Sequence, residues 1–161
     1  MSRHLFLTGE PQVGKSTLLH HYLTQQHGTV GGFCTVWGNA SHTTLHLLPY
    51  TGGVCCVKNC VAVRENGILL PHSTVFDTLG CALLKAPCDL LVMDELGYLE
   101  SDALEFQRAV LAALDGKQPV LGVIKPQHTP FLDAVRAHTS VHIVEVTMDN
   151  RETLTQPQDF L

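Results

Sequence analysis

The sequence predicts an α/β fold in three layers, with a mostly parallel central sheet and a β-rich hairpin segment. The prediction depends first on alternation: apolar runs of strand length alternate with longer segments that repeat their apolar residues every three to four positions. Second, the run 90–93 is continuously apolar, which is typical of a strand covered on both faces of a parallel sheet. Strands joined through helices in this way are expected to have right-handed crossovers.

The expected elements follow one another from a strand at 4–8, which runs into a glycine-bounded loop. The segment 29–48 holds two short β-rich pieces, with Gly38-Asn39 as the expected hairpin turn. The segment 54–70 alternates loosely around a turn signal at Glu65-Asn66-Gly67. Further strands are expected at 90–93, 119–124 and 141–146, and helices at 16–26, 74–85, 101–115 and 131–137.

The helix expected at 101–115 shows the clearest periodicity. Ser101 or Asp102 is expected to cap its start, because short polar side chains satisfy free backbone N–H groups there. Its core stripe is expected to contain Leu104, Leu111 and Leu114. In helix 16–26 the expected apolar face consists of Leu18, Leu19, Tyr22 and Leu23.

Length and composition predict one globular domain over 1–161, since 45% of residues are hydrophobic and 16% are charged. The net charge of −5, without a basic run, argues against nucleic acid and anionic membranes as partners. The apolar run near the N-terminus is too short for a signal peptide, and no stretch approaches the length of a membrane span. We therefore expect a cytoplasmic protein whose six cysteines are reduced.

The strongest motif is a phosphate-binding loop between the first strand and the first helix. It matches G-x-x-x-x-G-K-[ST] without a mismatch. Glycines let successive N–H groups point at phosphate oxygens, and the helix start adds positive charge. Lys15 is expected to reach the β- and γ-phosphates, the Ser16 hydroxyl to bind Mg2+, and Thr17 to contact the α-phosphate. The residues of the loop are Gly9, Glu10, Pro11, Gln12, Val13, Gly14, Lys15 and Ser16.

The second half of the expected site is the apolar strand 90–93 followed by Asp94 and Glu95. A parallel strand ends at the edge of the sheet where phosphates bind. We expect Asp94 to hold the hydration shell of Mg2+, and Glu95 to orient or deprotonate the attacking water. Many buried strands also end in solvated acids, so this pattern gains its meaning from the phosphate loop.

Smaller features near these motifs leave alternatives open. Gly97 either faces the γ-phosphate with its N–H or forms an ordinary turn. Lys125, Gln127 and His128 follow a buried strand and either face the nucleotide base or form a plain polar loop. The sequence 94–97 also reads as the D-x-x-G of GTPases, but no guanine-reading N-K-x-D follows it.

Four segments resemble a known family: FLTGEPQVGKSTL, GGFCT, LLVMDELGYLE and VEVTMDNRETL. They resemble the small P-loop nucleoside-triphosphatases, which include thermostable bacterial and archaeal enzymes and the cancer-related nucleoside triphosphatase of animals. The resemblance implies a compact P-loop fold. It also implies an enzyme that slowly hydrolyses ATP, GTP and other NTPs to NDP and phosphate, with loose base preference. It also implies that Asn150 and Arg151 lie beside the nucleotide or cap a helix, and that Glu100 matches a later Glu of structural role.

The sequence departs from the family pattern at one place. Relatives usually carry an arginine shortly after the GFxT segment, whereas Val36-Trp37-Gly38-Asn39 follows here. An arginine that stabilises the transition state is worth a large factor in rate. Arg64 and Arg151 are the better candidates for such a cation, and a missing or poorly placed one predicts slow turnover.

The sequence therefore predicts a Mg2+-dependent NTP phosphohydrolase with Lys15 and Glu95 as catalytic residues, and with Ser16 and Asp94 at the metal. A nucleotide or small-molecule kinase is an alternative, although the arginine-rich lid typical of such kinases is missing. A nucleotide-binding regulator with little hydrolysis is a second alternative. Base preference and oligomeric state do not follow from the sequence.

Overall fold

The computed structural model describes residues 3–154 and shows one eight-stranded sheet with the order β5-β4-β3-β2-β6-β7-β1-β8. The pairs β2–β6, β6–β7, β7–β1 and β1–β8 are parallel, whereas β2–β3, β3–β4 and β4–β5 are antiparallel. The expected parallel sheet and β-rich hairpin segment are thus the two halves of a single sheet. The strands are β1 His4–Thr8, β2 Val30–Trp37, β3 Thr44–Pro49, β4 Cys60–Glu65, β5 Ile68–Pro71, β6 Leu90–Leu96, β7 Val120–Ile124 and β8 Val141–Glu145.

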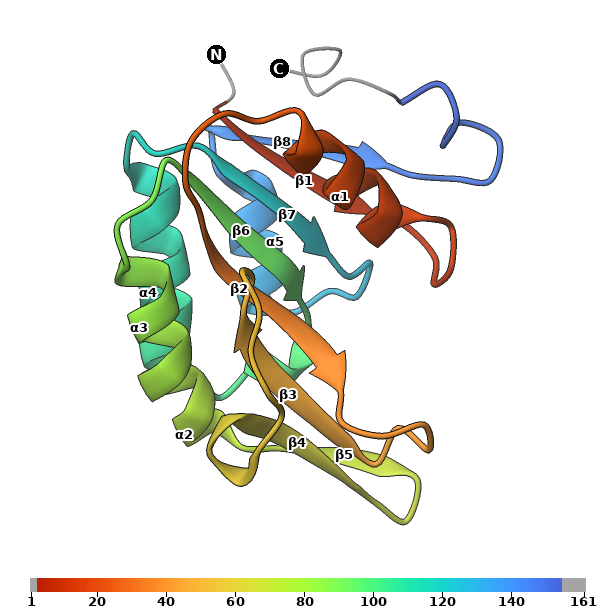
Figure 1. Ribbon diagram of the computed structural model, residues 1–161, viewed down its shortest axis with the longest axis vertical. Coiled ribbons are helices and arrows are strands. Elements are labelled where there is room, and N and C mark those ends of the chain that lie inside the picture. The colour runs from red at the N-terminus through yellow and green to blue at the C-terminus, as the bar shows by residue number, and fades with distance from the viewer. Residues whose placement is uncertain (1–2, 155–161) are drawn as a thin grey trace.

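Helices cover both faces of the parallel half, which confirms the three layers (Figure 1). Helix α1 lies on one face, and α3, α4 and α5 lie on the other. Within residues 3–154, no helix has the length and hydropathy needed to cross a membrane. The helical segments are α1 Lys15–Thr24, η1 Val57–Asn59, α2 Ser73–Val75, the π-helical η2 Phe76–Gly80, α3 Cys81–Lys85, η3 Tyr98–Glu100, α4 Leu104–Asp115 and α5 Pro130–Ala137.

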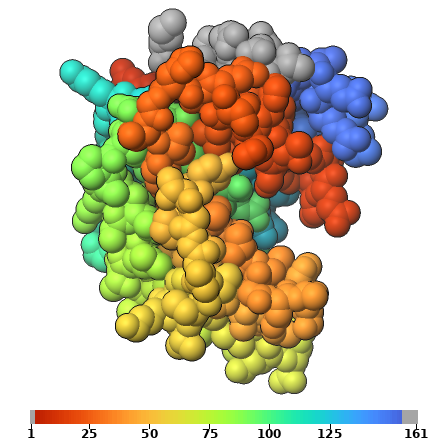
Figure 2. Space-filling model, in the orientation of Figure 1, coloured from red at the N-terminus to blue at the C-terminus, as the bar shows by residue number. Residues whose placement is uncertain are grey.

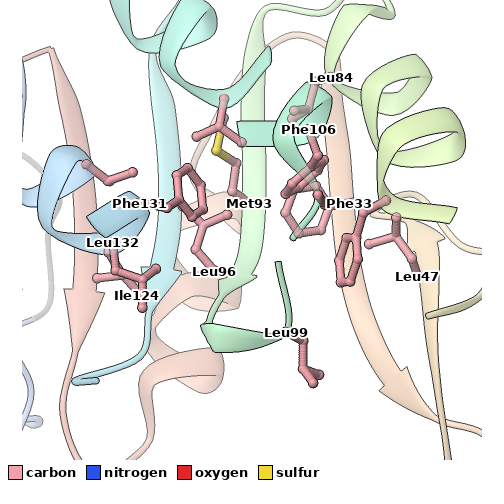
Figure 3. Packing of buried hydrophobic residues seen from close by; sticks show 14 of the residues in the cluster. Phe33, Leu47, Leu84, Met93, Leu96, Leu99, Phe106, Ile124, Phe131 and Leu132 are labelled. Atoms are coloured by element: carbon pink, nitrogen blue, oxygen red, sulfur yellow. The ribbon is translucent and has the colours of Figure 1, made fainter. Parts of the chain in front are cut away.

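The core consists of one apolar cluster on each face of the sheet. On the face of α4 and α5, Phe106 packs edge-on against Phe33 with ring centroids 5.5 Å apart, and Met93 lies beside them (Figure 3). On the opposite face, Leu19 and Tyr22 of α1 are fully buried against the sheet. The expected apolar face of the first helix is therefore confirmed, with Leu23 only partly buried.

The side chains on the two faces of the central strand β6 pack against different layers. Leu91 and Met93 belong to the cluster beneath α4, whereas Val92 belongs to the cluster beneath α1. Because side chains alternate along a strand, Asp94 continues the face of Val92 and points to the side of α1. The strand thereby delivers one carboxylate to the layer that carries the phosphate loop.

The start of the fourth helix differs from the expectation. Helix α4 begins at Leu104, three residues later than expected, and its N-cap residue Ala103 offers no side chain for capping. The free N–H of Phe106 donates instead to the Asp77 carboxylate of η2, at 2.9 Å. Neither Ser101 nor Asp102 caps the helix, because a partner distant in the sequence takes that role.

The core stripe of α4 was also expected on the wrong residues. Leu104 is 55% exposed, and the buried residues are Phe106, Val110 and Leu114. The later start of α4 leaves Leu104 in the first turn, on the solvent side. Only Leu114 of the expected stripe is buried.

The two hairpin turns of the β-rich half differ in how well the sequence indicates them. The β4–β5 turn lies at Asn66 and Gly67, both with positive φ, as expected from the turn signal. The β2–β3 connection is longer than the expected turn at Gly38-Asn39. Within it, Asn39 receives the Thr43 N–H at 2.9 Å and closes a wider loop.

Candidate functional site

The phosphate loop links the end of β1 to the start of α1, as the motif requires. Gly14 has φ 100° and forms the N-cap of α1, so the first free N–H groups of the helix face the loop. Gly9 has φ 138°, and a Cβ placed on it would lie 2.4 Å from the Val146 carbonyl oxygen. Both positions therefore require glycine for steric reasons.

Lys15, the first residue of α1, reaches back across the phosphate loop with its side chain. Its ammonium donates to the carbonyl oxygens of Gly9, at 2.5 Å, and Glu10, at 2.8 Å. Burial lowers the pKa of Lys15, and the nearby Glu95 carboxylate opposes that effect. The ammonium thus has backbone partners that anionic phosphate oxygens can replace with stronger, charge-assisted bonds.

A cavity of about 710 Å³ opens over the loop. In Figure 2 the surface is hollowed between the red segment that contains the phosphate loop and the orange β2–β3 connection. The volume lies within the range of sites for small molecules and cofactors. The cavity is lined by Gly9, Glu10, Pro11, Gln12, Gly14, Lys15, Ser16, Thr17, Glu95, Lys125, Pro126, Gln127 and Arg151.

Asp94 and Glu95 lie near the carboxyl end of β6, which finishes at Leu96. Asp94 is paired in register with Cys34 of β2 and Val123 of β7, so it lies at the centre of the sheet edge. Burial and then the charge of Glu95 raise the pKa of Asp94 to about 6, against the effect of Lys15. A divalent cation would favour the ionised form of such a carboxyl.

Glu95 is the more accessible acid of the pair. It lines the cavity, its side chain is 29% exposed, and it lies 3.5 Å from the Lys125 ammonium. The two carboxyl groups thus have different environments, as two different roles would require.

Glu100 and Gly97 form one structural unit behind the site. The Glu100 side chain is 3% exposed, and its Oε2 accepts the Gly97 N–H at 2.6 Å. Burial raises the pKa of Glu100 to about 8, although that N–H bond counteracts it. Since the Gly97 N–H already has a partner, the ordinary-turn alternative describes Gly97 better than a γ-phosphate contact.

A model of the NTPase family matches residues 4–157. The chain belongs to this NTPase family. The nucleoside-triphosphatase THEP1 of Thermotoga sp. is 24% identical over 157 residues, with 93% of this chain and 90% of that protein covered. The protein of the same name from Thermofilum pendens is 27% identical over 166 residues, covering 95% of this chain and 91% of that protein.

A solved structure shows the same fold. The crystal structure of THEP1 from Aquifex aeolicus superposes with a TM-score of 0.77 at 19% identity, covering 98% of this chain and 96% of that one. The NTPase fold predicted from the sequence is therefore confirmed over nearly the whole chain.

The two neighbouring residues Asn150 and Arg151 have different positions in this NTPase. Asn150 ties the turn after β8 together: its side chain accepts the Thr147 N–H at 2.8 Å and donates to the Glu145 carbonyl oxygen at 2.8 Å. It does not line the cavity, and since the described residues form no helix after β8, its side chain closes a turn and does not cap a helix. Arg151 does line the cavity, with Cδ 3.7 Å from a Cβ placed on Gly14.

Several other candidates lie away from the cavity. Arg64 donates to the carbonyl oxygens of His42 and Gly67, at 3.0 and 3.1 Å, and its guanidinium lies 5.7 Å over the Trp37 ring. His128 pairs with Asp133 at 2.7 Å and is not among the lining residues. Val13 is buried in the α1 cluster, so this loop residue has a packing role.

A second cavity of about 510 Å³ adjoins the first. The two share Gly14, Thr17 and Arg151, and the second is also lined by Leu18, His21, Glu152 and Leu154. No motif in the sequence indicated it, because its walls are ordinary residues of the first helix and of the segment after β8.

Proposed function

We propose that this protein is a Mg2+-dependent phosphohydrolase that converts nucleoside triphosphates to NDP and phosphate. One observation carries the proposal: the carboxyl ends of β1 and β6 bring the lysine of the phosphate loop and the Glu95 carboxylate to one cavity, with the Asp94 carboxylate nearby. Lys15 and Glu95 line this cavity, and Asp94 is close enough to both for their charges to affect its pKa. The names of the THEP1 relatives, nucleoside-triphosphatases, support the same reaction.

The residues present suit Mg2+, which prefers oxygen ligands and usually takes only one or two from the protein. The Ser16 hydroxyl at the start of α1 would bind the ion directly, and the Asp94 carboxylate would hold a water of its shell. Bound there, the ion would neutralise charge on the β- and γ-phosphate oxygens.

In the proposed reaction Lys15 and Glu95 have separate roles. Lys15 leaves the Gly9 and Glu10 carbonyls and binds the β- and γ-phosphates. The Glu95 carboxylate orients a water and accepts its proton while the water oxygen bonds to the γ-phosphorus. The bond from that phosphorus to the bridging oxygen breaks, and NDP leaves with the electron pair.

The second cavity gives the nucleoside a place beyond the phosphate loop. It begins at Gly14 and Thr17, and its walls offer the aliphatic Leu18 and Leu154 beside the Arg151 guanidinium. Such walls pack against any base, which supports a loose preference among ATP, GTP and other NTPs.

Phosphate release from a panel of NTPs, with Mg2+ and with excess EDTA, tests the proposal. We expect release from several NTPs that depends on Mg2+ and needs no acceptor. Release only after addition of an acceptor would establish the kinase instead. Binding of a fluorescent NTP without phosphate release would establish the regulator.

A further inference from the structure

Lys125 is held in place at both its backbone and its aliphatic stem. It directly follows β7; its N–H donates to the Leu96 carbonyl oxygen at 2.9 Å, and its own carbonyl oxygen accepts from Arg136 at 2.5 Å. The stem crosses Gly97, where an added Cβ would lie 3.1 Å from the Lys125 Cδ. The side chain thus runs through space that the glycine leaves free.

The ammonium of Lys125 reaches the reacting end of the cavity. It lies 3.5 Å from the Glu95 carboxylate and 5.7 Å over the ring of Tyr98. The side chains of Lys125 and Glu95 are 35% and 29% exposed. Ion pairs this accessible contribute little to stability, so stability does not explain this arrangement.

A cation at the γ-phosphate, besides the loop lysine and the metal, accelerates phosphoryl transfer by about 10³–10⁵-fold. Four of the five described arginines are engaged elsewhere. Arg3 donates to the Gly116 carbonyl oxygen, Arg64 donates to two carbonyl oxygens of the hairpins, Arg136 supports the Lys125 backbone, and Arg108 pairs with Glu105. The fifth, Arg151, lines the cavity beside Gly14, whereas Lys125 contacts Glu95.

We propose that Lys125 is a further catalytic residue, which binds an oxygen of the transferring γ-phosphoryl group and stabilises its charge in the transition state. This inference rests on the proposed NTPase activity. In the structure the ammonium pairs with Glu95. When NTP binds, the phosphate competes for the ammonium and leaves the Glu95 carboxylate free to orient water.

The proposal also accounts for two neighbouring residues. Gly97 makes room for the stem, and the Tyr98 ring provides a second, weaker partner for the ammonium between turnovers. A lysine is a flexible point charge without the two-pronged geometry of an arginine. Such a cation is consistent with slow turnover.

Lys125→Met tests the inference, because methionine retains an aliphatic stem over Gly97 and removes only the charge. Lys117→Met is the matched control, since Lys117 is exposed and lies before β7, at the opposite end of that strand. Three quantities are measured for each protein: kcat with saturating MgNTP, the Kd of MgNDP, and the Kd of MgNDP with aluminium fluoride, which imitates the transferring phosphoryl group.

We expect Lys125→Met to lower kcat about 10²–10³-fold and to weaken the aluminium fluoride complex by a similar factor. The Kd of MgNDP should change less than about threefold, because NDP lacks the group that Lys125 binds. A kcat within threefold of wild type, or equal loss of affinity for both complexes, would overturn the assignment. Wild-type protein that hydrolyses no NTP would overturn the proposed function itself, a separate result.

Discussion

The polar groups at the two ends of the central sheet differ in whether they already have protein partners. At the amino end of the strands, His4 is fully buried and uses both ring nitrogens: Nε2–H donates to the Leu114 carbonyl at 2.8 Å, and Nδ1 accepts the Val120 N–H at 3.1 Å. Asp89 accepts both the N–H and the hydroxyl of Thr29. These groups have found protein partners and have little capacity left for a ligand.

At the carboxyl end the same strands carry groups with unused capacity. Lys15 binds only backbone carbonyls, the Asp94 carboxyl is buried with a raised pKa, and Glu95 shares one accessible ion pair. In the part of the chain that the structure describes, Thr8 Oγ1 at this end is the buried side-chain polar atom left without a partner. The difference teaches that one end is built for stability and the other retains polar groups for a ligand.

The largest effect expected at the carboxyl end follows from Lys15→Ala. Removal of the ammonium leaves the β- and γ-phosphates without their principal side-chain cation, so kcat/KM should fall at least about 10³-fold. Phosphate-release kinetics measure this, with Lys85→Ala as the exposed control. Activity within tenfold of wild type would show that the loop lysine does not serve hydrolysis.

Glu95→Gln should have the next largest effect, separating chemistry from binding. The amide cannot accept a proton, so kcat should fall about 10²-fold or more. The affinity for MgNTP should be retained or improved, because a negative charge facing the phosphates is removed. Single-turnover kinetics and nucleotide titration report the two quantities, with exposed Glu65→Gln as control; unchanged kcat would eliminate Glu95 as the base.

At the amino end, His4→Ala should affect stability and leave chemistry unchanged. The change leaves the Leu114 carbonyl and the Val120 N–H buried without partners, at a cost of about 2–3 kcal/mol in the free energy of unfolding. Urea unfolding at pH 7.5 measures it, with exposed His20→Ala as control. If kcat of the folded variant fell as well, the separation between the two ends would be wrong.

The same substitution has a pH signature. Burial lowers the pKa of His4 below its ordinary value of 6.5, so below that pH the unfolded chain binds a proton that the folded protein resists. The free energy of unfolding of wild type should therefore decrease as the pH falls below 6.5, and that of His4→Ala should decrease less.

The smallest effect is expected from Glu100→Gln, on the carboxyl side but behind the cavity. Because the folded pKa of about 8 exceeds the ordinary 4.5, ionisation destabilises the folded protein increasingly as pH rises from about 4.5 to 8. Glutamine still accepts the Gly97 N–H and cannot ionise. Relative to wild type, the free energy of unfolding of the variant should increase by at least about 1 kcal/mol at pH 8, or about 2–4 °C in Tm, and should not change at pH 5. If variant and wild type had equal Tm values at both pH values, the burial argument would be contradicted.

The order of strands and helices in the parallel half was predictable because continuous apolar runs and glycine-bounded loops are local signals. The end of the β4–β5 hairpin was predictable for the same reason, since Asn66 and Gly67 both accept positive φ. The start of α4 was not, because the group that satisfies Phe106 N–H belongs to Asp77, 29 residues away. The sequence near Ser101 contains no trace of that partner.

The site divides along the same line. The phosphate loop and the Asp94-Glu95 pair are each a continuous stretch of sequence. The structure brings the loop and Glu95 to one cavity and leaves Asp94 outside its lining, close enough for Lys15 to affect its pKa. The chemical roles of these residues stay predictions. For Lys125 the sequence left open a place near the nucleotide base or a plain polar loop. Its pairing with Glu95 was not predicted, because nothing in the segment around Lys125 indicates that partner. Asn150 and Arg151 are adjacent in the chain, yet only the turn after β8 decides that one binds backbone and the other faces the cavity.

The first glycine of the phosphate loop has a consequence for how a descendant of this protein would change. The Val146 carbonyl oxygen occupies the space a side chain on Gly9 would need, so even alanine would push β8 and the segment leading to Arg151 aside. Gly9 is thus required by the protein's own packing, with or without a nucleotide. A descendant that lost hydrolysis could replace Lys15 long before it could replace Gly9. Retention of the glycine alone would therefore indicate common ancestry, whereas retention of the lysine would indicate activity.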